Sequence, residues 1–126
     1  YVLEDKVYYF VRQDDDCKQG FLTYYDLKTE KWATPCLIRD AQSRSDFIVY
    51  NRKLYLIHAP LDRDGFGIVR IDRDDLANSR PLAVVRMGES LFYPFARVMG
   101  DTVYLSYTVD RKHIRLTHFD AKAYLK

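Results

Sequence analysis

The sequence is poor in the features that mark several large protein classes. It has no long run of lysine and arginine, and its 20 basic and 18 acidic residues leave a formal net charge of +2. A mixed surface of this kind gives little support for binding nucleic acid or an anionic membrane. No apolar run approaches the length of a membrane span, and neither a glycine-rich phosphate loop nor a Gly-x-Ser-x-Gly element is present. We therefore expect no nucleic-acid partner and no membrane span.

Groups that bind metals or form disulfides are also scarce. The two cysteines, Cys17 and Cys36, fall in a polar loop and an expected strand. If the turn near Thr29 pairs the strands around it, Cys36 lies opposite roughly Tyr24, so a disulfide is not favoured. The run at 14–16 is three successive aspartates without the spacing of a calcium loop, which favours a solvated turn.

The three histidines give no support for a metal site either. His113 and His118 are five residues apart in an expected strand, on opposite faces of it, and no cysteine is near them. We expect no metal and no cofactor. The sequence opens YVLEDKVYYF, without an initiator methionine or a signal-like apolar core, so we expect a mature or excised piece of a longer protein. A start of this kind leaves the localisation open.

Aromatic and hydrophobic residues are abundant. Hydrophobic residues make up 48% of the 126 and aromatic residues 15%, including eleven tyrosines and seven phenylalanines. These residues favour strands and are common where sheets pack or where sugars are held. Helical periodicity is hard to find outside a short turn at 74–78. The composition therefore predicts a packed all-β domain.

Three divergent repeats are visible. The segment VMGDTVYLSYT at 98–108 aligns without a gap on VYNRKLYLIHA at 49–59, at an offset of 49 residues (98 − 49), and KVYYF at 6–10 matches KLYLI at 53–57. Each copy continues with a polar loop and another strand. Self-similarity near this period is typical of four-stranded propeller blades.

The repeats predict a partial β-propeller with blades at about 1–40, 41–88 and 89–126. We expect three, four and three strands in them, with no strand before Asp5 and a fourth strand of the first blade at 33–38. Three blades do not close a ring, because their flanks would expose unpacked sheet. We expect the remaining blades of a roughly six-bladed parent protein, or a second copy, to close it.

The last two blades resemble a known family. Phe92-Tyr93-Pro94, followed by the strand 103–108, Arg111 and Ile114, resembles the closing blade of the BNR-repeat sialidase-like propellers. Ser45-Asp46 and the downstream strand at 54–58 fit the preceding blade, so the resemblance covers about 44–119. The family's aspartate box is not intact: YDLKTEKW at 25–32 occupies its place without a glycine.

The resemblance implies a sialidase-like glycoside hydrolase that acts on glycans bearing a carboxylate, in a secreted, periplasmic or cell-surface setting. Tyr93 takes the place of the nucleophile, and a tyrosine avoids repulsion by an anionic substrate. Blade geometry puts the starts of the innermost strands on the same face as the polar loops. The residues that we expect to bind substrate there are Arg44, Asp46, His58, Arg63 and Arg111, and the catalytic glutamate and aspartate lie outside this chain.

Two other functions stay open. A propeller of this kind can bind glycans without cleaving them, and the 25–32 segment is also reminiscent of a kelch-like protein-interaction scaffold. Simpler roles also remain for single residues. Tyr93 can pack at the start of its strand, Arg44 and Arg63 can be solvated loop charges, and His58 can be a hydrogen-bonded structural histidine.

Overall fold

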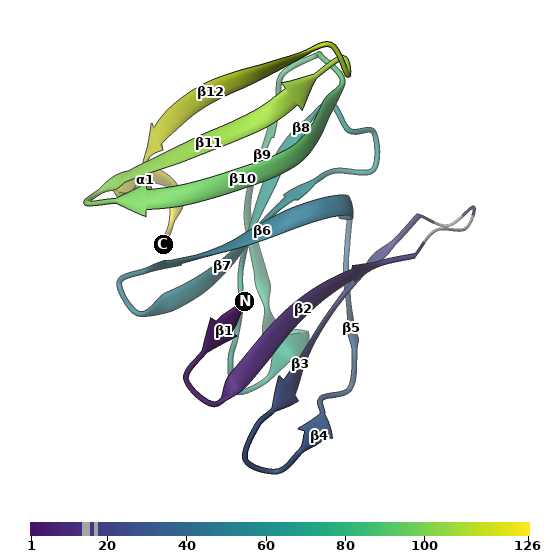
Figure 1. Ribbon diagram of the computed structural model, residues 1–126, viewed down its shortest axis with the longest axis vertical. Coiled ribbons are helices and arrows are strands. Elements are labelled where there is room, and N and C mark those ends of the chain that lie inside the picture. Colours follow the sequence, from purple (N-terminus) through teal and green to yellow (C-terminus); the bar gives the residue numbers. More distant parts are fainter. Residues whose placement is uncertain (14–15, 17) are drawn as a thin grey trace.

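The computed structural model describes residues 1–13, 16 and 18–126, and its fold is all-β, as the composition predicts (Figure 1). Three antiparallel sheets follow one another along the chain, and they do not close into a barrel. In the described part of the chain, helical structure is limited to one 3₁₀ turn, η1 (Leu76–Asn78), and one short helix, α1 (Ala121–Tyr124). The arrangement is consistent with a partial propeller. No helix among the described residues is long and apolar enough to cross a membrane.

The first sheet contains five strands: β1 (Val2–Leu3), β2 (Lys6–Arg12), β3 (Gly20–Asp26), β4 (Lys31–Trp32) and β5 (Cys36–Ile38). Two expectations were wrong here. A short strand does precede Asp5, since Val2 pairs with Val7. Of the single strand expected at 33–38, only the end forms, as β5. The separate strand β4 pairs with β3 just before this segment, and pairing is interrupted around Pro35, which has no N–H to donate to a ladder.

The break also moves Cys36. It lies opposite Leu22, and not opposite Tyr24 as the simple turn geometry predicted. Cys36 has no disulfide partner among the described residues, and its thiol contacts the carbonyl oxygen of Thr34 at 3.6 Å. Cys17 and most of the 14–16 aspartate run lie outside the described residues.

The second and third sheets are regular meanders. The second has strands β6 (Gln42–Tyr50), β7 (Lys53–Ala59), β8 (Gly65–Arg70) and β9 (Arg80–Arg86), and the third has β10 (Leu91–Met99), β11 (Thr102–Val109) and β12 (His113–Asp120). The β6–β7 turn has positive φ at both Asn51 and Arg52, as the tightest hairpin turns require. Gly100 supplies positive φ in the equivalent β10–β11 turn.

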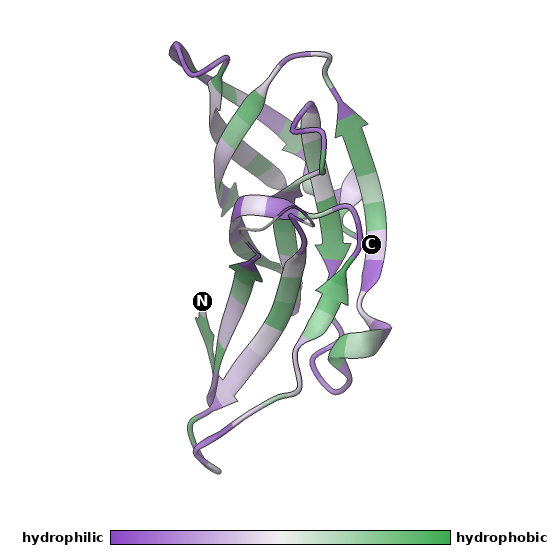
Figure 2. Cartoon of the chain, turned by 90° about the vertical axis from the view of Figure 1, so that its right-hand side faces the viewer, coloured by the Kyte–Doolittle hydropathy of each residue, from purple (hydrophilic) through white to green (hydrophobic). Residues whose placement is uncertain are grey.

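The core lies between the sheets, and the second sheet is covered on both faces. In β7, Leu54 and Leu56 face the first sheet, whereas Tyr55 and Ile57 face the third, and all four are fully buried. Because successive side chains of a strand point to opposite faces, an unbroken apolar run is expected in a strand buried on both sides. Figure 2 shows hydrophobic residues along the strands and hydrophilic residues in the connecting loops.

The two outer faces remain apolar and exposed. Trp32 on the first sheet is 59% exposed, and Ile114 on the third is 77% exposed. Other large apolar side chains share these faces, among them Tyr9, Val11, Leu37, Phe95 and Leu116. The expectation that further blades or a second copy cover these faces stays a prediction.

Candidate functional site

The strands β6 and β10 both begin with an irregularity on the same end of the sheets. The register shifts between Gln42 and Asp46 in β6, and between Phe92 and Phe95 in β10, so each strand has extra residues there. Within these bulges Ser43 has φ +63° and Tyr93 has φ +56°. Positive φ is uncommon for residues other than glycine, and bulges often re-aim side chains next to functional sites. This end of the sheets is therefore where a functional site is expected.

The β10 bulge presents two adjacent aromatic rings. The ring centroids of Phe92 and Tyr93 lie 6.0 Å apart. Phe92 is buried, whereas Tyr93 is 46% exposed and its ring is open to a ligand. Pro94 follows and is itself buried, which fixes the backbone just after the tyrosine. The two rings are tilted by 54° to one another and form an angled platform, in which Phe92 is anchored in the core and Tyr93 is accessible.

Three arginines from three different segments converge on this platform. The guanidinium carbon of Arg44 lies 5.1 Å from the ring centroid of Tyr93, and those of Arg63 and Arg111 lie 5.3 and 4.9 Å from that of Phe92. A guanidinium within about 6 Å of a ring centroid is attracted by the ring's electrons. We call these five residues the arginine–aromatic site. It joins four of the six residues that the sequence predicted: Tyr93, Arg44, Arg63 and Arg111.

Arg63 is the most firmly held of the three. Its N–H donates to the carbonyl oxygen of Pro60 at 2.9 Å, and its own carbonyl accepts from the N–H of Leu91 at 2.7 Å. Its guanidinium contacts the side-chain oxygen of Gln42 at 3.4 Å. Gln42 is buried and donates in turn to the carbonyl oxygen of Leu61. The β7–β8 loop therefore holds Arg63 in one position before any ligand arrives.

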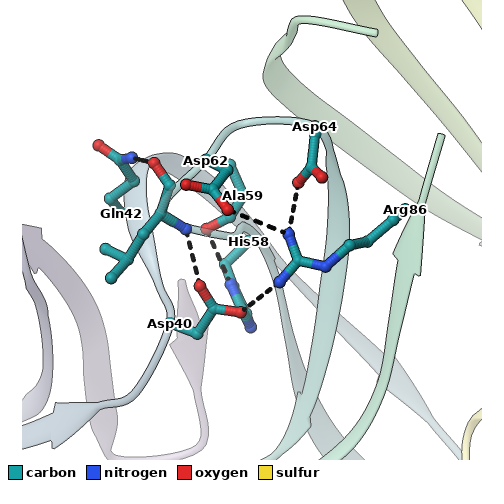
Figure 3. A network of polar contacts seen from close by, with 8 residues as sticks. Asp40, Gln42, His58, Ala59, Asp62, Asp64 and Arg86 are labelled. Carbon is teal, nitrogen blue, oxygen red and sulfur yellow. Dashed lines mark hydrogen bonds and ion pairs between the residues drawn. The ribbon is translucent and has the colours of Figure 1, made fainter. Parts of the chain in front are cut away.

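The acidic residues of the same region are committed to a different arginine (Figure 3). The guanidinium of Arg86 lies 2.6 Å from Asp64, 3.2 Å from Asp40 and 3.7 Å from Asp62. The hydrogen bond that Arg86 donates to Asp64 and the charges of all three carboxylates raise the pKa of Arg86. Because these carboxylates gather on Arg86, they do not neutralise Arg63.

The charge of the arginine–aromatic site is consequently not balanced within it. Among the residues that the structure describes, no carboxylate forms an ion pair with Arg44, Arg63 or Arg111. A guanidinium can pair with a carboxylate through two parallel hydrogen bonds, and an aromatic ring can stack on the apolar face of a sugar. The arrangement can therefore bind an anionic ligand that also has a flat apolar face.

Asp46 lies elsewhere and already has its partners. One carboxylate oxygen accepts from the N–H of Phe47, and the other from the N–H of Ala96, both at 2.9 Å. The second oxygen also lies 3.3 Å from the guanidinium of Arg97. Ala96 and Arg97 belong to β10, so Asp46 joins the innermost strands of the second and third sheets.

His58 is placed as a structural histidine rather than a ligand-binding one. Its side chain is 2% exposed, and its Nδ1 lies 3.0 Å from the carbonyl oxygen of Ala59. Burial lowers the pKa of His58, an effect that this contact and the charge of Asp40 partly oppose. The ring packs on Gly67, where a Cβ atom would come within 2.2 Å of it. His58 therefore packs between the end of β7 and the start of β8, next to the loop that joins them.

Two residues of the site region were not predicted. Phe92 was read only as part of the motif around Tyr93, although two arginines stack on its ring. Gln42 was not considered, although it orients Arg63. Both act through contacts between segments about 20 or more residues apart in the chain, which no local pattern reports. A signal was present for Phe92 alone, since it directly precedes the predicted Tyr93.

Comparison with protein-family models, with curated proteins and with solved structures gave no match. Within the described ranges, no group of three or more histidine, cysteine or acidic side chains is placed to hold a metal ion. The features of the molecule are therefore those of its own structure. It is an all-β protein of three antiparallel sheets with a cationic, aromatic site at one end.

Proposed function

We propose that this chain is the glycan-binding part of a carbohydrate-active, sialidase-like propeller, and that its arginine–aromatic site binds a sugar bearing a carboxylate. The observation that carries the proposal is the meeting of three arginines, without carboxylate partners among the described residues, on the rings of Phe92 and Tyr93. The arginines supply bidentate donors for the sugar carboxylate. The exposed Tyr93 ring supplies a surface for the sugar ring.

Hydrolysis is the second candidate, favoured by the position of Tyr93. It is exposed, adjacent to the arginines and held at positive φ in a bulge. A tyrosine nucleophile needs a general base within hydrogen-bond reach. None of the described carboxylates is hydrogen-bonded to the Tyr93 hydroxyl, so the base would come from the remaining blades. Binding of the carboxylate does not depend on it.

The experiment is a binding measurement with matched ligands. We would titrate the protein with a carboxylate-bearing oligosaccharide and with its methyl ester, which has the same sugar rings but no negative charge. We expect the acid to bind at least about tenfold more tightly, a difference of about 1.4 kcal/mol. Equal binding of both ligands would reject the carboxylate as the recognised group.

Matched variants locate the site. Arg63→Ala is expected to weaken binding of the acid at least about tenfold and to have little effect on the ester. Arg39→Ala is the control, because Arg39 is exposed and, like Arg63, has no ion pair with a described carboxylate, but it lies outside the site. An Arg39→Ala effect as large as that of Arg63→Ala would show that net charge, and not this site, attracts the ligand.

A further inference from the structure

A second cationic region lies at the opposite end of the second sheet. The β7–β8 loop and the start of β6 belong to the end that carries the arginine–aromatic site. The start of β7, the end of β8 and the start of β9 therefore meet at the other end, because the strands are antiparallel. An open pocket of about 450 Å³ lies there. Six charged side chains line it, and we call it the basic pocket: Lys53, Arg70, Arg73, Arg80, Asp72 and Asp74.

The cations of the basic pocket outnumber its available anions. Arg73 pairs with Glu4, but Lys53, Arg70 and Arg80 form no ion pair with a carboxylate of the described residues. Asp72 is partly occupied by its own loop, since one of its oxygens accepts from the backbone N–H groups of Asp74 and Asp75. With four basic and two acidic groups (4 − 2), the lining has a net charge of +2.

The two arginines of neighbouring strands repel one another. Arg70 of β8 and Arg80 of β9 are direct cross-strand partners in the ladder, so their side chains share one face of the sheet. Like charges directly opposite one another are destabilising, and neither arginine forms an ion pair with a described carboxylate. A bound anion would remove that cost.

A buried hydroxyl lies close enough to both arginines to feel their charge, although it is outside the pocket. Tyr55 lies directly opposite Arg70 in the β7–β8 ladder, and its hydroxyl is buried without a hydrogen-bond partner in the described structure. Burial raises the pKa of Tyr55, while the positive charges of Arg70 and Arg80 lower it. Tyr55 itself is fully buried and does not line the pocket, so only the side chains of the pocket can meet an oxyanion with several acceptor oxygens.

We propose that the basic pocket binds a tetrahedral oxyanion, the sulfate or phosphate ester group of a sugar ligand, between Arg70 and Arg80. Two guanidinium forks offer donors from two directions, and Lys53 adds a point charge. Oxygens arranged as a tetrahedron can accept from donors in several directions, whereas the acceptor sites of a carboxylate lie in one plane. The choice of a sugar ester rests on the proposed function, whereas binding of the oxyanion does not depend on the arginine–aromatic site, which lies at the other end of the sheet.

The test follows the side-chain Nε–H signals of the arginines by NMR. Inorganic sulfate and phosphate are added first, at an ionic strength held constant with sodium chloride, followed by glucosamine 6-sulfate and glucose 6-phosphate. We expect saturable shifts of the Arg70 and Arg80 signals with the inorganic ions and with at least one sugar ester. The preferred ester identifies the source of the oxyanion. Shifts that do not saturate, or binding of neither ester, would overturn the proposal.

Two variants complete the design. Arg80→Gln is expected to weaken binding at least about tenfold and, at low salt without added anion, to raise the unfolding midpoint by removing the repulsion from Arg70. Arg39→Gln changes the net charge equally and is expected to bind as the unmodified protein does. If Arg80→Gln unfolds, Arg70→Gln takes its place. Equal losses in the Arg39 and Arg80 variants would reject the pocket as the binding site.

Discussion

Arg44 and Tyr93 occupy equivalent positions in two successive repeats, and the fold places the guanidinium of the first 5.1 Å from the ring of the second. Both sit in bulges at the start of an innermost strand, where Ser43 and Tyr93 have positive φ. A bulge at the start of the innermost strand therefore carries a cation in one repeat and an aromatic ring in the next, although the β6 bulge is one residue longer. Their contact makes the arginine–aromatic site a property of two blades together.

Tyr93→Phe separates binding from hydrolysis. Tyr93 is 46% exposed and no hydrogen bond of its hydroxyl to a described residue is seen, so we expect a change in stability within about 0.5 kcal/mol. The ring remains, and carboxylate-glycan binding should persist. If the parent protein hydrolyses glycosides through this residue, turnover falls more than about a thousandfold. Turnover of aryl glycosides and anionic glycans would be measured for the parent protein and for its Tyr93→Phe variant. Undiminished turnover in the variant would exclude Tyr93 as nucleophile.

His58 should make the protein less stable in mild acid. Burial lowers the pKa of His58 below its ordinary 6.5. Below about that pH the unfolded chain binds a proton that the folded chain does not, so stability falls as the pH falls and is fully present above it. We expect the urea midpoint to drop between about pH 7.5 and pH 5.5, with a smaller drop in His58→Gln. His113→Gln, at an exposed position, is the control and should retain the full drop.

Gly67→Ala should disturb the packing of His58 next to the β7–β8 loop. A Cβ at Gly67 would come within 2.2 Å of Cε1 and 2.3 Å of Nε2 of the His58 ring, and the buried ring has little room to move. We expect a loss of about 1–3 kcal/mol in the free energy of unfolding, measured by urea denaturation. In the double variant with His58→Ala the added methyl group should cost much less. An equal cost in both backgrounds would place the strain elsewhere.

Two buried tyrosines should respond in opposite ways to loss of their hydroxyl groups. The hydroxyl of Tyr50 donates to Asp101 at 2.6 Å, which ties the β6–β7 turn to the third sheet, and Asp101 also pairs with Lys122. The hydroxyl of Tyr55 is buried without a partner among the described residues. We therefore expect Tyr50→Phe to lower the unfolding midpoint and Tyr55→Phe to leave it unchanged or raise it. Thermal unfolding of both variants at low salt checks this, and a loss confined to Tyr55→Phe would contradict it.

The sequence predicted the strands better than the contacts between them. Alternation and turn residues located β6, β7, β10 and β11, because their hairpins depend on neighbouring residues such as Asn51 and Gly100. The split at Pro35 was missed, since pairing with β3 resumes only after the proline, and the register of Cys36 changed with it. Local sequence does not report where a segment pairs again after an interruption.

The same distinction holds for the site. The repeat offset and the blade geometry placed Tyr93, Arg44, Arg63 and Arg111 on one face, and the structure brings these four together. Asp46 and His58 were expected to line the site with them. Asp46 instead spans two strands, and His58 is buried. Which polar side chain faces a ligand depends on packing that the order of residues along one strand does not contain.

The bulge in β10 allows the residues of the arginine–aromatic site to change without loss of strand pairing. Two residues, Tyr93 and Pro94, stand between the paired positions Phe92 and Phe95, where the neighbouring strand β11 has only Tyr107. Substitutions at Tyr93 therefore change no paired residue of the β10–β11 ladder. Removal of one residue there would restore strict alternation, so that the side chains at the start of β10 would point to the opposite face of the sheet. Evolution or engineering can accordingly replace Tyr93 and so change which ligand the site binds, while β10 stays paired with β11, as long as the length of the strand is preserved.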